Sequence, residues 1–155
     1  MQITRETDYA IRCLLHLARR PRRVVPAAEI AAAARVPQVF LAKILQRLAR
    51  AGLVRSQRGA QGGFLLTRAP GAITLLDAVE AVQGSVALNR CAGTRERCAL
   101  EASCPAHPVW VRLSVRLARD LRKHSFGKLA QPQTKEGTMH QGGRRCPNTP
   151  TTRKR

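Results

Sequence analysis

The stretch from residue 37 to residue 67, PQVFLAKILQRLARAGLVRSQRGAQGGFLLT, determines how the rest of the sequence is interpreted. Its first half predicts a helix from Pro37 to Ala51, with Gly52 as the C-cap. One face of this helix is apolar and therefore suited to packing on a core, with Phe40, Leu41, Ile44, Leu45 and Leu48. The remainder is polar and basic, with Gln38, Lys43, Gln46, Arg47 and Arg50.

A shorter helix is predicted just before this stretch. Residues 26–34 read PAAEIAAAA, with Pro26 suited to the first helical position, and three residues, Arg35 to Pro37, separate the two helices. Two helices joined in this way are typical of a helix-turn-helix, whose second helix enters the major groove of DNA. An ordinary helical hairpin with a solvated face explains these residues equally well.

The second half of the stretch favours the helix-turn-helix. Two short strands, Leu53 to Ser56 and Phe64 to Thr67, flank the glycine-rich loop at residues 57–63. A phosphate-binding loop would instead end in Gly-Lys-Ser/Thr and lead into a helix. A hairpin after a helix-turn-helix is a wing, and Arg58 at its tip is placed to enter a narrow minor groove.

The flanking segments predict three further helices. The first runs from Arg5 to Arg20 with Thr4 as its N-cap, and another runs from Leu75 to Gln83 between Thr74 and Gly84. The last begins near His107 and carries two apolar stripes, one of Trp110, Leu113, Leu117 and Leu121 and the other of Val111, Val115 and Ala118. Two stripes exceed what one domain buries, so we expect a partner helix from a second copy of the chain.

The predicted fold is therefore mainly α with a small β-hairpin: a winged helix-turn-helix domain plus a long C-terminal dimerisation helix. We expect the DNA-binding domain to span residues 1–84, a cysteine-rich loop 85–107 and the dimerisation helix 108–126. Residues 127–155 are rich in Gly, Pro, Thr and Gln without periodicity, which predicts a disordered basic tail.

Three of the five cysteines lie in the segment CAGTRERCALEASCPAH, residues 91–107, with the spacing C-x6-C-x5-C-x2-H. A zinc site with three cysteines and a histidine is one interpretation, although zinc ligands usually come in closer C-x2-4-C pairs. An iron–sulphur cluster tolerates wider gaps because its irons are spread apart. Disulfide exchange or simple packing of the thiols are the remaining interpretations.

Composition limits the classes of function. The 155 residues carry a formal charge of +19, with 28 basic and 9 acidic residues, which favours a polyanionic partner such as nucleic acid. No signal peptide or apolar membrane span is recognisable, so we expect a cytoplasmic protein with reduced thiols and no membrane partner. No paired carboxylates or nucleophile–base set is evident, which argues against an enzyme.

Four segments together resemble one known family. They are MQITRETDYAIRCLLHLA, PQVFLAKILQRLARAGLV, RGAQGGFLL and CAGTRERCALEASCPAHPVW, in that order within residues 1–126. They look like the IscR/NsrR (Rrf-two) family of bacterial winged-helix transcription regulators. The resemblance implies a homodimer that binds double-stranded operator DNA and carries an iron–sulphur cluster, 2Fe-2S or 4Fe-4S.

The same resemblance assigns the cluster ligands. Cys91, Cys98 and Cys104 match the family's three cysteines, and the fourth ligand matches His107 in some branches and Asp8, supplied by the partner subunit, in others. One departure is the first gap of six residues, where five is commonest. The expected function is a DNA-binding repressor whose cluster senses redox state, nitric oxide or iron–sulphur status; a thiol-switch regulator without a cluster and a small zinc or redox enzyme are the alternatives.

If the chain is a DNA-binding regulator, its expected DNA contacts lie on the second helix of the helix-turn-helix and on the wing. Gln38, at the helix start, is placed for a base edge. Lys43, Arg47 and Arg58 are placed mainly for phosphates or the minor groove.

Overall fold

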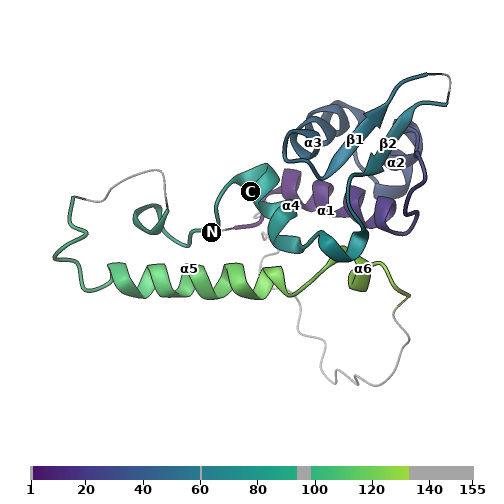
Figure 1. The fold of residues 1–155 in the computed structure, drawn as a ribbon. Coiled ribbons are helices and arrows are strands. Elements are labelled where there is room, and N and C mark those ends of the chain that lie inside the picture. The colour runs from purple at the N-terminus through teal and green to yellow at the C-terminus, as the bar shows by residue number, and fades with distance from the viewer. Residues whose placement is uncertain (1, 60, 94–98, 133–155) are drawn as a thin grey trace, which may run out of the picture.

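The computed structural model describes residues 2–59, 61–93 and 99–132, and it is a group of helices from which one small hairpin projects (Figure 1). The elements, shown in Figure 1, are α1 (Arg5–Ala18), α2 (Ala27–Ala34), α3 (Gln38–Arg50), β1 (Val54–Gln57), β2 (Gly63–Leu66), the 3-10 helix η1 (Pro70–Ala72), α4 (Leu75–Gln83), the 3-10 helix η2 (Arg90–Ala92), α5 (His107–Arg122) and α6 (Phe126–Leu129). The predicted class, mainly helical with one antiparallel hairpin, is confirmed.

Helix α1 lies at the centre of the domain. Thr4 caps it as predicted, because its side chain accepts a hydrogen bond from the Thr7 amide at 3.3 Å. Its buried face packs against α2, α3, α4 and α6, and it presents Ala10, Cys13, Leu14, Leu17 and Ala18 to the core. The helix ends at Ala18, two residues earlier than predicted, and the chain then turns through Arg19 and Arg20.

The helix-turn-helix is formed by α2 and α3. Each helix begins one residue after its proline, so Pro26 and Pro37 are N-caps and not the first helical residues that the sequence predicted. Between the helices, Arg35 adopts a left-handed conformation with φ 52°, which turns the chain within three residues. Helix α3 buries Leu41, Ile44, Leu45 and Leu48, four of the five residues predicted for its apolar face.

The wing is an antiparallel pair in which Val54 faces Leu66 and Gln57 faces Gly63. Each strand lies one residue closer to the turn than predicted. The backbone of Val25 exchanges two hydrogen bonds with Phe64, at 2.9 and 2.8 Å, and so forms an isolated β-bridge beside β2. This contact needs glycine at position 63, where a Cβ would lie 2.3 Å from the Val25 carbonyl oxygen.

Helix α4 has the predicted bounds and is fixed by a capping box. The Thr74 hydroxyl accepts from the Asp77 amide, and the Asp77 carboxylate accepts from the Thr74 amide at 2.7 Å. The C-terminal part of the chain packs at the N-terminal end of α4, because the Leu75 amide donates to His124 O at 2.9 Å and the Phe126 amide donates to Ile73 O at 2.8 Å. Phe126 is fully buried, so the boundary predicted at residue 127 falls inside α6; residues 133–155 of the predicted tail lie outside the described residues.

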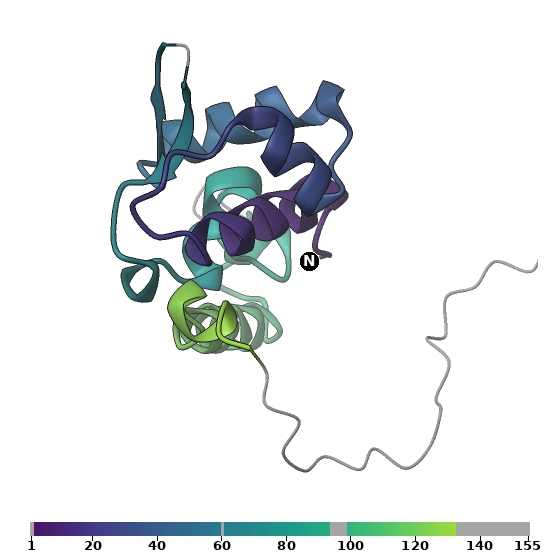
Figure 2. The same ribbon diagram turned by 90° about the vertical axis from the view of Figure 1, so that its right-hand side faces the viewer.

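Helix α5 is on the opposite side of the domain from α3 and the tip of the wing (Figures 1 and 2). The C-terminal half of both predicted stripes packs on the domain, where Leu117, Ala118 and Leu121 contact Leu76, Val79 and Val86. The N-terminal half is exposed and carries Val109, Trp110, Val111, Leu113 and Val115. Among the described residues, no helix has the length and apolar character needed to cross a membrane.

Candidate functional site

Helix α3 presents an open face at its N-terminal end. Gln38, Val39 and Phe40 are all exposed there, and Val39 is 81% accessible on a helix whose other large apolar residues are mostly buried. Tyr9 of α1 packs beside Phe40, with ring centroids 6.0 Å apart. The side chain of Gln38 is therefore accessible to a surface that approaches this end of the helix.

The two predicted basic contacts on α3 are occupied by one carboxylate. Glu6 of α1 accepts from Lys43 at 3.1 Å and from Arg47 at 2.6 Å. Hydrogen bonding to Lys43, followed by the charges of Arg47 and Lys43, lowers the pKa of Glu6. The Arg47 guanidinium also donates to Val82 O at 3.2 Å, so Arg47 joins α1, α3 and α4 as well as facing the surface.

The wing tip presents Arg58 to solvent. The turn that follows places Gly59 at φ 118°, a conformation that favours glycine, and the Gly62 amide donates to Gly59 O at 2.9 Å. A Cβ at Gly62 would lie 2.7 Å from Gln57 O, so the turn admits no side chain there. Among the described residues of the tip, Arg58 is therefore the charged group that the hairpin projects away from the core.

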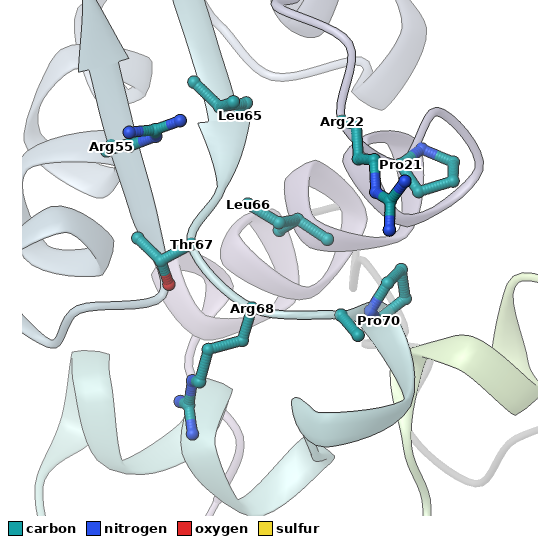
Figure 3. Close-up of a pocket in the computed structure, with 9 residues that line it drawn as sticks. Pro21, Arg22, Arg55, Leu65, Leu66, Thr67, Arg68 and Pro70 are labelled. Atoms are coloured by element: carbon teal, nitrogen blue, oxygen red, sulfur yellow. The ribbon is translucent and has the colours of Figure 1, made fainter.

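A basic cleft at the base of the wing was not singled out from the sequence. Its volume is about 630 Å³, and Arg22, Arg55 and Arg68 line it around an apolar floor that includes Leu65 and Leu66 (Figure 3). No carboxylate among the described residues pairs with these three arginines. Arg55 lies in β1 and Arg68 follows β2, so the sequence could have placed these two at the hairpin. Arg22 is distant in the sequence, three residues before the Val25 that bridges to Phe64.

The cysteine loop is described only in part. Cys91 lies in η2, which packs against α5, and Cys104 lies in the turn that leads into α5. Both are partly buried free thiols, whereas Cys98 lies outside the described residues. Within the described ranges, no three His, Cys, Asp or Glu residues are gathered closely enough to hold a metal ion.

Among the described residues of this loop, His107 is a candidate metal ligand. It is the first residue of α5, and its amide donates to Cys104 O at 3.2 Å, which places Cys104 and His107 in one backbone turn. Its Nε2 lies 3.4 Å from a Glu101 carboxylate oxygen, while its Nδ1 is buried and has no hydrogen-bond partner. A buried imidazole nitrogen without a partner is costly, and a metal ion would satisfy it. The residues present here thus fit a thiolate and imidazole ligand set.

Asp8 is paired with an arginine, and Cys13 is packed in the core. Asp8 forms an ion pair with Arg12 one turn later on α1, at 2.6 Å, and both side chains are 45% exposed. Cys13 is fully buried in the core, and burial raises the pKa of its thiol to about 12. Cys13 is therefore a packing residue, while the carboxylate of Asp8 is accessible from outside the subunit.

Comparison with known sequences gives a consistent picture. The profile of the Rrf2 family, described as iron-dependent transcriptional regulators, matches residues 3–132. Protein aau3 of Rhizobium meliloti (strain 1021) is 42% identical over 105 residues, 67% of this chain and 68% of that protein. The HTH-type transcriptional regulator IscR of Xenorhabdus nematophila is 34% identical over 134 residues, 86% of this chain and 81% of that protein.

Solved structures show the same fold. CymR (YrzC), the global cysteine regulator of B. subtilis, superposes with a TM-score of 0.69 at 26% identity, covering 84% of this chain and 96% of that one. IscR of T. potens gives a TM-score of 0.66 at 22% identity, covering 83% of this chain and 85% of that one. The oxidised form of Staphylococcus aureus CymR gives 0.66 at 23% identity, covering 85% and 98%.

Proposed function

This chain belongs to the Rrf2 family of bacterial transcriptional regulators, and we propose that it is a cytoplasmic repressor whose affinity for operator DNA is set by an iron–sulphur cluster. The family consists of DNA-binding regulators and not enzymes. The observation that carries the proposal is the turn at the start of α5, where Cys104 precedes an imidazole with a buried, unpartnered Nδ1.

The cluster would be held by the thiolates of Cys91, Cys98 and Cys104, with His107 or the partner subunit's Asp8 as the fourth ligand. When bound, a 2Fe-2S or 4Fe-4S cluster supplies a group that changes with oxidation, nitric oxide or iron–sulphur supply. The chain's own contribution is the position of the ligands. Cys91 reaches α5 through η2, and the Leu88 amide just before it donates to Ser114 Oγ at 3.0 Å, so movement of this loop acts directly on α5.

The DNA interface that we propose combines α3 with the wing. Gln38 would contact a base edge, Lys43 and Arg47 would contact phosphates, and Arg58 would enter the minor groove. The cleft arginines, Arg22, Arg55 and Arg68, extend the positive surface along the base of the wing. Phosphate contacts of this kind supply most of the salt-dependent affinity of a DNA-binding protein.

We also propose that α5 pairs with the same helix of a second subunit. The N-terminal half of α5 exposes Val109, Val111, Leu113 and Val115, and α5 itself lies on the side of the domain opposite α3 (Figures 1 and 2). A dimer joined there leaves both recognition helices free for half-sites about one helical turn of DNA apart. A loop attached to α5 can then alter the spacing between the two recognition helices.

A thiol switch without a cluster is the rival function. It is favoured by the likeness to CymR, described as a global cysteine regulator and also solved in an oxidised form. Cys91 and Cys104 are both free and partly exposed, as such a switch requires. The two functions differ in what the loop holds: a coloured iron–sulphur centre, or a disulfide that dithiothreitol reverses.

Cys104→Ala and Cys13→Ala form a matched pair for the test. After anaerobic reconstitution, we expect Cys104→Ala to lose the visible absorption of the cluster and its effect on operator affinity. Cys13→Ala should keep both, because its thiol is buried in the core and has a pKa of about 12. Retention of the full spectrum by Cys104→Ala would refute the ligand assignment, and DNA affinity that responds to dithiothreitol but not to iron would favour the thiol switch.

A further inference from the structure

The carboxylate of Glu6, on α1, lies beside two cations of α3. Its two carboxylate oxygens separately accept hydrogen bonds from Lys43 at 3.1 Å and Arg47 at 2.6 Å. These are the two cations of α3 that the proposed interface assigns to phosphates. The Lys43 side chain is 56% exposed and that of Arg47 is 31% exposed, so the ion pairs are at the surface and open to exchange.

The carboxylate partner sets Lys43 and Arg47 apart from the other basic groups assigned to the DNA surface. Arg22, Arg55, Arg58 and Arg68, the other basic groups assigned to the DNA surface, have no such partner among the described residues. One of the few carboxylates is thus directed at the recognition helix.

The first turn of α1 is held rigidly, which fixes Glu6. Gln83, the last residue of α4, accepts at Oε1 from the Thr4 amide at 3.1 Å and from the Thr7 hydroxyl at 2.6 Å. Its Nε2 donates to Gln2 O at 3.0 Å. Three hydrogen bonds on both sides of Glu6 therefore tie this turn to the end of α4, from which the chain continues through Gly84 toward Cys91.

We propose that Glu6 is an intramolecular competitor of DNA phosphate for Lys43 and Arg47, and that the Gln83 junction holds it in place. Binding of DNA then exchanges one carboxylate partner for phosphates, so these two cations contribute less affinity than free cations would. The proposal rests on the DNA-binding role of α3 proposed above and adds a residue outside the interface that sets its strength.

Glu6→Gln tests the proposal, with Glu80→Gln as the matched control. Both remove one negative charge, but Glu80 is exposed on α4 and its side chain has no partner among the described residues. With cluster-free protein, we expect Glu6→Gln to bind duplex DNA about three- to tenfold more tightly at low salt. Its plot of log affinity against log salt should steepen by about one to two, because each newly neutralised phosphate adds about 0.9 to the slope.

A double variant separates competition from altered folding. If Glu6 masks Lys43, then Lys43→Gln should cost little affinity in the wild-type background and clearly more in the Glu6→Gln background. Thermal unfolding of each variant identifies any that fails to fold, and Gln83→Leu, which removes the polar anchor and keeps Glu6, should give an intermediate gain in affinity.

The outcomes are distinguishable. If wild-type protein binds no duplex DNA, the proposed function fails. If the wild type binds DNA but Glu6→Gln and Glu80→Gln give the same affinity and the same salt slope, the competitor role of Glu6 is wrong while the DNA-binding function stands. Equal costs of Lys43→Gln in the two backgrounds would also overturn the proposal.

Discussion

His16 is the buried histidine that joins α1 to α2. Arg20 lies 3.3 Å from its Nδ1, and since arginine only donates, Nε2 carries the proton and faces a Glu29 oxygen at 3.4 Å. Arg20 and Arg23 approach the same carboxylate at 3.3 and 3.5 Å. Glu29 is thus surrounded by positive charge, and the imidazole is held as the neutral form.

This arrangement predicts a loss of stability in mild acid. Burial, and then the charge of Arg20, lowers the pKa of His16 against the opposing effect of Glu29. In the unfolded chain the histidine has a pKa of about 6.5, so the contribution of His16 to the free energy of unfolding is fully present above that pH. As the pH falls below it toward the native pKa, the unfolded chain takes up the proton first and the free energy of unfolding decreases.

Urea unfolding at about pH 7.5 and about pH 5.5 measures this effect. We expect the wild type to lose more stability between the two pH values than His16→Gln, which has no imidazole to protonate. The same loss in both proteins would show that His16 does not contribute to the acid dependence.

At this scale, the sequence predicted local partners and missed distant ones. Thr4 and Thr74 were recognised as caps because a capping side chain and the amide that donates to it are three residues apart. The ion pairs of Glu6 join residues 37 and 41 positions apart, and they depend on how α1 crosses α3. The sequence therefore identified Lys43 and Arg47 as candidate phosphate contacts without revealing the partner that already occupies them.

Among the elements, the wing depends most on a single backbone contact. A Cβ at Gly63 would lie 2.3 Å from Val25 O, inside the pairing that joins residue 25 to β2. We expect Gly63→Ala to cost about 2–3 kcal/mol of unfolding free energy, because the contacted atom is backbone and has little room to move. Displacement of the hairpin should also weaken DNA binding.

Gly71→Ala is the control for this substitution, since a Cβ there would meet no atom within 4 Å. Its unfolding free energy should stay within about 0.5 kcal/mol of the wild type in chemical denaturation. If the two alanine variants prove equally stable, the Val25–Phe64 pairing is not what holds the wing.

Helix bounds were easier to predict than strand bounds. The bounds of α4 were correct because Thr74 and Gly84 mark both ends in the sequence. Each strand of the wing begins and ends one residue closer to the turn than predicted. The bridge between Val25 and Phe64, and with it the cleft lined by Arg22, was not predicted, because residue 25 is separated from the wing by two helices.

At the scale of the whole molecule, the exposed half of α5 predicts a dimer that one charge disrupts. Val115 is 53% exposed in the isolated subunit and would be buried by a partner helix. An unpaired carboxylate at that interface is costly, so Val115→Glu should raise the dissociation constant of the dimer by at least about 100-fold. Sedimentation equilibrium measures the change.

Val115→Ala is the matched control, because it shortens the same side chain without adding a charge. It should sediment as the wild type does. Monomeric wild-type protein at all concentrations, or a Val115→Glu protein that remains dimeric, would contradict the proposed role of α5.

The overall architecture was predictable because each of its elements carries its own periodicity and caps. The apolar stripes of α5 were recognised, but only the structure shows that their C-terminal half packs on Leu76, Val79 and Val86. The position of Cys98 lies outside the described residues, so the full ligand set remains a proposal supported by Cys91, Cys104 and His107.

The most direct test of the central claim is the iron and acid-labile sulphide content of the wild-type protein after anaerobic reconstitution. The proposed function predicts coloured protein with about two or about four irons per subunit and an equal amount of sulphide. Colourless protein without bound iron under these conditions would contradict it and leave the thiol switch as the remaining function for the cysteine loop.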